Sequence, residues 1–294
     1  MSALSPGISL RPSGRLRRRR VLNTIMESLG TGAAFLAVAM LGLVIVTVAI
    51  RAAPAISLDF FTKPPNVFGG PGGGISSALI GSALIVAMAT GLALPVGVLI
   101  AIYLTEFAPR RVAAPIQLVL DVLNGLPTIV TGIFVYGLLV IGHTQSAYAG
   151  AFALATVMLP LVSRAAQEVL LLVPSALREG ALALGVSRWR AVLGVILPTT
   201  FGGILTGTVL AVARAAGETA PLLFTSSIFN PSVSTDVTHA LPNLPVLIFN
   251  YSEQPDQALH EQAWGAALVL MAFVLVASLS AKALLARSRK KLGR

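Results

Sequence analysis

The sequence of 294 residues contains no cysteine, so it can form no disulfide, no thiolate metal site and no cysteine nucleophile. Charge is also scarce: 11% of the residues are charged and 55% are hydrophobic. A soluble domain carries about a quarter charged residues, because its surface must be solvated. The shortage of charge excludes an ordinary soluble enzyme and a disordered chain, and it predicts a polytopic membrane protein.

Catalytic motifs are missing as well. No Gly-Lys-Ser/Thr occurs, so the glycine-rich segment 69–74 is interpreted as a flexible external loop, and the chain is not expected to hydrolyse nucleotides. Its three histidines, His143, His239 and His260, lack the spacing of a zinc site. We therefore expect a non-catalytic chain that binds no metal and no cofactor of its own.

Long charge-free runs locate the membrane spans, since a spanning helix needs about 20 apolar residues. The prediction is an all-α protein with six transmembrane helices. These cover about residues 28–52, 76–103, two helices within the run 122–163 joined by a hairpin at Gly142–Ser146, 191–213 and 262–281. The expected organisation is a basic arm (1–27), a first helix (28–52), an external loop (53–75), a five-helix core (76–281) and a basic tail (282–294).

Positive charge orients these helices. Of the 21 basic residues, all but Arg51, Lys63 and Arg214 fall in segments on one side of the predicted membrane. Basic residues gather on the cytoplasmic side, so both termini are expected in the cytoplasm. The arginine-rich arm is interpreted as an orientation signal that touches anionic lipid rather than as a nucleic-acid site. Five further spans come after the first, which favours an uncleaved anchor over a signal peptide.

The predicted cytoplasmic segment Val173–Pro198 carries the signals of a helical elbow. Ser175 suits an N-cap before a helix over 176–184, and Gly185 suits the left-handed residue that ends it. Ser187 suits the N-cap of a second helix, which is expected to end before Pro198. Such an amphipathic elbow could lie on the membrane surface or dock into a groove of a soluble partner.

The elbow resembles a known family signature. Within it, Glu179, Ala181, Gly185, Leu197 and Pro198 match the EAA-x3-G-x9-I-x-L-P pattern of bacterial ABC-importer permeases, with Gly180 and Val195 as departures. The segments 124–139, 168–190 and 213–225 are further similar to the PstA family of phosphate-transport permeases. The similarity extends over about residues 75–281.

That resemblance implies a fold, a site and partners. The fold would be that of a type I ABC importer permease in the bacterial inner membrane, with the loop 173–198 as a coupling helix. The coupling residues carried over, or placed on the same elbow, are Arg178, Glu179, Ala181, Gly185, Arg188 and Pro198. The implied partners are a homologous permease (PstC-like), two ATPase subunits (PstB-like) that use ATP, and a phosphate-binding protein (PstS-like).

An intramembrane charge pair is the candidate for the substrate path. An arginine at membrane depth costs about 3 kcal/mol or more, so Arg214 is expected to serve a pathway, paired with Glu218 four residues later on one helical face. The planar guanidinium of Arg214 offers paired N–H donors that suit phosphate oxygens, and Thr219 and Thr225 could add hydroxyl donors. The alternative is an ion pair that only locks two helices together.

The predicted function is the transmembrane subunit of an ATP-driven phosphate importer, coupled to a separate ATPase. A permease for another oxyanion stays open. A gradient-driven anion transporter should show inverted repeats or several intramembrane carboxylates, and neither is found in the sequence. A lipid-modifying membrane enzyme should show paired carboxylates or clustered histidines, which the sequence also lacks.

Overall fold

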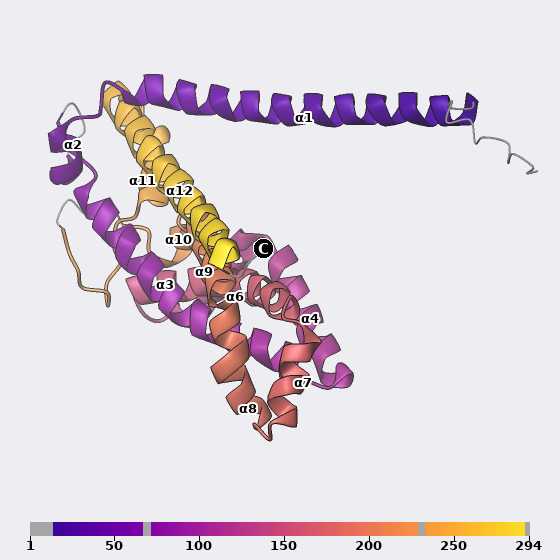
Figure 1. The fold of residues 1–294 in the computed structure, drawn as a ribbon. Helices are drawn as coiled ribbons and strands as arrows, with labels where there is room; N and C mark the ends of the chain where they lie inside the picture. Colours follow the sequence, from indigo (N-terminus) through magenta and orange to yellow (C-terminus); the bar gives the residue numbers. More distant parts are fainter. Residues whose placement is uncertain (1–13, 67–71, 229–232, 292–294) are drawn as a thin grey trace, which may run out of the picture. The chain divides into compact units, whose positions relative to one another are not determined.

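The computed structural model describes residues 14–66, 72–228 and 233–291, and every regular element in these ranges is a helix (Figure 1). The all-α prediction is confirmed for this part of the chain. The α-helices are α1 (Gly14–Ala52), α2 (Leu58–Thr62), α3 (Ser76–Ile102), α4 (Arg110–Gly125), α5 (Thr128–Val135), α6 (Ala147–Leu171), α7 (Ser175–Ala183), α8 (Arg188–Ala191), α9 (Leu197–Ala215), α10 (Ala220–Thr225), α11 (Leu244–Ser252) and α12 (Gln257–Lys291). Three π-helical turns extend them: η1 (Tyr103–Phe107), η2 (Tyr136–Val140) and η3 (Val192–Ile196).

Among the described residues, five helices are long and apolar enough to cross a membrane. They cover Arg17–Ala52, Ser76–Phe107, Ala147–Leu171, Arg188–Ala215 and Gln257–Ala283. A sixth candidate exists only if Arg110–Gly125 and Thr128–Val140 are taken together as one broken span, because the two helices are bent by 100°. The prediction of six spans is therefore met by five straight spans and one broken pair.

The third span differs from its prediction. The charge-free run predicts a helix that begins near residue 122 and contains Pro127, but the chain bends at Leu126 and Pro127, and Pro127 stands at the N-cap of α5. Proline has no N–H to donate, and it pushes the preceding residue into extended backbone; Leu126 has ψ 136°. Residues 110–125 instead form α4, which the charge-free run does not predict.

The predicted segment boundaries move at the two ends of the chain. The first helix is described from Gly14, so residues 14–27 of the basic arm are helical, as the good helix propensity of arginine favours. The predicted external loop contains α2, with Ser57 as its N-cap. Residues 1–13 of the arm, 67–71 of the glycine-rich loop and 292–294 of the tail lie outside the described residues.

Small residues let α3, α6 and α9 pack closely. The cores of α3 and α6 meet through residues such as Ala89, Ala93 and Ala151. Gly203 and Gly207, four residues apart on α9, lie against α6; a Cβ on Gly207 would come within 2.5 Å of the Ala165 Cβ. Close backbone approach is a main source of helix association in a bilayer, where burial of apolar surface gives little. These three helices form the frame that positions the candidate site.

A second apolar cluster joins α2, α3, α11 and α12. Phe60, Tyr251 and Leu259 are buried within it. Gly265 of α12 lies directly on the Phe60 ring, because a Cβ there would be 2.7 Å from the ring's Cζ. This packing fixes the first turns of α12 beside α2.

Candidate functional site

The predicted charged residues lie where α9 gives way to α10. The first helix ends at Ala215 and the next begins at Ala220, so Glu218 and Thr219 lie in a short break. The N–H of Glu218 donates to the Ala215 carbonyl at 3.1 Å, which closes a turn there. The expectation that Arg214 and Glu218 share one helical face is therefore wrong. Pro221 explains the break, because it lies in the first turn of α10, where a missing N–H costs nothing.

The two charges still meet across this break. Arg214 Nε lies 3.9 Å from Glu218 Oε1. The arginine side chain is 60% exposed and the glutamate 17% exposed, so the pair is open on the arginine side. A separation of 3.9 Å is close to the limit for an ion pair and too long for a hydrogen bond, so the contact restrains the arginine only weakly. Within the described part of the chain the guanidinium makes no hydrogen bond, so its N–H groups can bind an anion from the open side.

Thr219 and Thr225 differ in whether their hydroxyl groups are already used in hydrogen bonds. Thr219 is half-buried at the N-cap of α10, and its side chain makes no capping hydrogen bond. Thr225 is fully buried and donates its hydroxyl to the Pro221 carbonyl at 2.8 Å. Thr219 therefore remains beside the charge pair, whereas Thr225 serves the interior of α10.

Close contacts with α5 and α6 seat α10 beside the break. A Cβ on Gly132 of α5 would lie 2.8 Å from Pro221 Cα, and a Cβ on Gly150 of α6 would lie 3.1 Å from Leu222 Cδ2. Gln145 donates to the Phe224 carbonyl at 3.1 Å and accepts from the Ser227 N–H at 2.8 Å. The far end of α10 is thus fixed by a side chain that sequence reasoning did not single out.

Replacing Gly132 with alanine is expected to destabilise the protein by about 1–3 kcal/mol, because the new methyl group would overlap backbone atoms of α10 that cannot move aside. The measurement is the thermal unfolding midpoint of the purified protein. Gly137→Ala is the matched control, since no atom lies within 4 Å of the added Cβ. Equal midpoints for the two variants would contradict the close packing.

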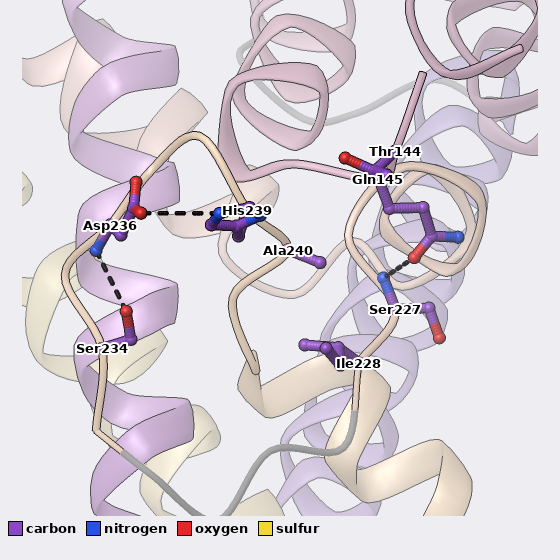
Figure 2. A pocket seen from close by; sticks show the side chains of 8 residues that line it. All are labelled: Thr144, Gln145, Ser227, Ile228, Ser234, Asp236, His239 and Ala240. Carbon is purple, nitrogen blue, oxygen red and sulfur yellow. Dashed lines mark hydrogen bonds and ion pairs between the residues drawn. The ribbon is translucent and has the colours of Figure 1, made fainter. Parts of the chain in front are cut away.

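A cavity of about 450 Å³ lies beyond the end of α10 (Figure 2). Gln145, Ser227 and Asp236 are among its lining residues, and Figure 2 shows Gln145 directed at the Ser227 backbone nitrogen. Thr238 donates its hydroxyl and its N–H to Asp236, which holds the pKa of that exposed carboxyl below its ordinary value. A negative charge on this wall opposes the binding of an anion there.

The predicted elbow is present, with two differences in its boundaries. α7 begins at Ser175 itself, with Pro174 at the N-cap, and Gly185 has a φ of +75°, as predicted. Ser187 is the N-cap of α8, but its side chain makes no capping bond. The second helix does not end before Pro198: it continues from Arg188 to Ala215, and the π-helical turn η3 ends at Ile196, two residues before the proline. The wider π turn accommodates a residue without an N–H.

The tip of the elbow is exposed and partly apolar. Leu184 is 85% exposed, and Trp189 is exposed while its ring lies 5.9 Å from the Phe107 ring. The remaining predicted coupling residues differ in exposure: Glu179, Gly185, Arg188 and Pro198 are exposed, Ala181 is half-buried and Arg178 is largely buried. Glu179, Gly185 and Arg188 are thus exposed on the elbow, whereas Pro198 is exposed on α9.

Arg178 points inward and joins three elements at the root of the elbow. Its guanidinium pairs with Glu106 of η1 at 3.0 Å, and it donates to the carbonyls of Leu170 and Val173 at 2.8 and 2.6 Å. The two charged side chains are only 24% and 10% exposed. This charged node ties α7 to the end of α3 and to the end of α6.

Sequence reasoning missed Glu106 because its partner lies 72 residues away. The available signal was the position of Glu106: it is the first charged residue after the 42-residue run that contains the second span, at the predicted cytoplasmic side, where arginines gather. Asp121 was missed for the same reason; it pairs with Arg164 and links α4 to α6. Within the described residues no group of three metal-ligating side chains occurs.

Comparisons with known proteins place this geometry in a family. Residues 93–292 match the family model described as "Binding-protein-dependent transport system inner membrane component". Curated relatives named "Phosphate transport system permease protein PstA" include one from Xylella fastidiosa (38% identity over 93% of this chain and 96% of the relative). Others come from Haemophilus influenzae (40%, covering 87% and 91%) and Yersinia pestis (40%, covering 80% of each).

Solved structures agree on the fold. A chain of the MetNI methionine ABC transporter in an inward-facing conformation matches with a TM-score of 0.56 and 16% identity, over 73% of this chain and 95% of that one. A chain of a bacterial ABC transporter that imports alginate matches with a TM-score of 0.56 and 16% identity, over 92% and 99%. At that identity the likeness concerns the fold of an ABC importer permease.

Proposed function

The chain belongs to the family of binding-protein-dependent transport system inner membrane components. We propose that phosphate crosses the membrane along a path beside Arg214, and that this passage requires force applied at the elbow. It is a multi-pass membrane protein and a permease subunit of an ATP-driven phosphate importer. Two parts of the chain carry the proposed mechanism: the break between α9 and α10, and the elbow formed by α7 and α8.

The exposed guanidinium of Arg214 is the observation that carries the proposed path. Helix α9 runs unbroken from Leu197, so Arg214 lies about 24 Å along it from Pro198, which corresponds to the outer half of a bilayer about 30 Å thick. Two parallel N–H groups of the fork bind two phosphate oxygens, while Glu218 holds the arginine when the path is empty. The nearby carboxylate also repels a dianion, so phosphate is held only briefly, as passage requires.

The elbow is proposed to receive the force. The open face around Leu184, Trp189 and Glu179 docks into a groove of an ATPase subunit, and Arg178 carries the displacement inward. Because its guanidinium holds Glu106 and two carbonyls at the end of α6, a shift of α7 moves α3 and α6 with it. α6 packs on α9 through Gly203 and Gly207, so the movement reaches the helix that bears Arg214.

The remaining assignments complete the proposal. The chain works with ABC transporter partners, and we assign these as a homologous permease, two ATPase subunits and a phosphate-binding protein. ATP is used by the ATPase subunits, and this chain binds no cofactor and catalyses no reaction. The clustering of basic residues supports a bacterial inner-membrane orientation with both termini in the cytoplasm.

Vesicle uptake tests the function. Phosphate uptake by the reconstituted complex is expected to require ATP and the ATPase subunits, and to persist when the proton gradient is collapsed. Uptake by the isolated chain driven by a gradient would contradict the proposal. An excess of sulfate tests the alternative that the chain is a permease for another oxyanion. Phosphate uptake by such a permease would fall, because sulfate would compete with phosphate.

A further inference from the structure

A second cavity, of about 320 Å³, lies between Arg51, the first turns of α12 and the end of α11, and the proposed function does not use it. Four of its lining residues share one face of α12, at the spacing of successive helical turns: His260, Ala263, Trp264 and Ala267. The other walls are Arg51, Ile248 and Ser252. The cavity therefore combines an apolar floor with a few polar groups.

Arg51 supplies the charge. Its guanidinium carbon lies 5.0 Å from the centroid of the Trp264 ring, which is cation–π distance. Among the described residues no carboxylate lies within ion-pair distance of it. A guanidinium stacked on an aromatic face keeps the N–H groups of its edge free, and these groups match the oxygens of a phosphate in pairs.

His260 is an independent sign of a missing partner. Its Nε2 is shielded from solvent and has no hydrogen-bond partner in the described part of the chain. A buried polar atom without a partner is unfavourable, so a ligand oxygen placed here would be stabilised by a hydrogen bond from Nε2 in the tautomer that carries its proton there. Arg51 and His260 line the same cavity and both can donate to an anion.

The electrostatics favour an anion at this place. None of the lining residues is acidic, in contrast to the cavity of Figure 2, where Asp236 forms part of the wall. The nearest acidic residues along the chain, Glu253 and Glu261, do not line the cavity. The net charge of the walls is therefore set by Arg51.

The cavity's depth is given by its position on α12. The candidate span begins at Gln257, so residues 260–267 occupy its first three turns, where a spanning helix passes from the headgroup layer into the hydrocarbon. Arginine and tryptophan are the side chains that place an apolar body in the lipid and a polar end at this level. Ile248, Ala263 and Ala267 provide apolar surface next to the charged end.

We propose that this cavity binds a phosphate group, with Arg51 gripping its oxygens and His260 donating one hydrogen bond. Two sources offer that chemistry: the headgroup of an anionic phospholipid, whose acyl chain would lie along the apolar wall, and free inorganic phosphate. This inference does not depend on the path beside Arg214.

Tryptophan fluorescence distinguishes the sources. The chain has two tryptophans, so Trp189→Phe leaves Trp264 in the cavity as the only reporter. The full chain in this background is reconstituted in vesicles that carry brominated phosphatidylglycerol or, at the same mole fraction, brominated phosphatidylcholine. The anionic lipid is expected to quench Trp264 with about fivefold preference, the equivalent of about 1 kcal/mol for one cation at the surface. In a second arm, inorganic phosphate is titrated into phosphatidylcholine vesicles.

Substitutions decide the outcome. Arg51→Gln should remove the preference for the anionic lipid, or the response to inorganic phosphate if that is the ligand. Arg51→Lys should retain part of the same response, because the positive charge stays while the paired N–H donors of the guanidinium are lost. Lys63→Gln, a nearby exposed cation outside the cavity, should change nothing. The proposal is overturned if neither arm gives a response that Arg51→Gln removes, or if Lys63→Gln removes it equally. The thermal midpoint of each variant is measured to confirm that it is folded.

Discussion

Arg214→Gln is expected to reduce phosphate uptake by about 100-fold or more while the transporter complex still assembles in the membrane. Glutamine cannot offer two charged, parallel donors, and the loss of two charge-assisted hydrogen bonds is worth about 3 kcal/mol or more. Assembly should survive because the Arg214–Glu218 contact is long and lies at the break between α9 and α10, not within the packed core of the helices. The measurement is radiolabelled phosphate uptake in vesicles, normalised to the amount of purified complex.

Two further variants make this test specific. Arg214→Lys should recover part of the uptake, because the positive charge returns without the planar fork. Lys63→Gln is the matched control, since Asp59 and Lys63 form an exposed ion pair with the same i, i+4 spacing, and its uptake should be unchanged. If Arg214→Gln transports at the normal rate, the pair serves only to hold the break between α9 and α10, and the proposed path is wrong.

Glu106→Gln is expected to separate ATP hydrolysis from transport. It leaves the largely buried charge of Arg178 without a counter-ion, which should destabilise the root of the elbow by about 2–3 kcal/mol, below the full cost for a completely buried pair. α7 can still bind an ATPase subunit, but its movement is no longer passed firmly to α3. The complex should therefore hydrolyse ATP at a near-normal rate and take up several-fold less phosphate.

A double-mutant cycle checks that the two residues act together. Arg178→Gln alone should resemble Glu106→Gln, and the two changes combined should cost less than the sum of the single changes, since the pair is broken only once. Asp59→Asn, in an exposed pair with 57% and 62% exposed side chains, should leave both hydrolysis and uptake intact. Strictly additive losses, or a parallel fall in hydrolysis and uptake, would argue against transmission through this node.

The elbow illustrates how far local sequence signals reach. Gly185 adopts the left-handed conformation that its position predicts, because that preference resides in the residue itself. The effect of Pro198 on the helix could not be predicted in the same way. Whether a proline ends a helix depends on whether the preceding turn can widen, and here η3 widens so that the helix continues into α9.

The charge pairs show the same limit at longer range. The pairing of Arg214 with Glu218 was accessible because only four residues separate them, although the chain reaches that contact through a break rather than along a helix. The partners of Arg178 and Arg164 were not accessible, since Glu106 and Asp121 are brought to them by the packing of α6 against other helices. Spacing along the chain carries no information about such contacts.

Residue types and their order were sufficient to predict a helical membrane protein, the approximate positions of its straight spans, and the corner of the elbow. These properties arise from the transfer of apolar side chains into lipid and from backbone preferences, which act residue by residue. The folded arrangement was needed to show that Arg178 is anchored inward, that α10 is seated by Gly132 and Gly150, and that Arg51, Trp264 and His260 surround one cavity. Those features depend on close contact between distant segments, because steric fit and charge pairing act only over a few ångströms.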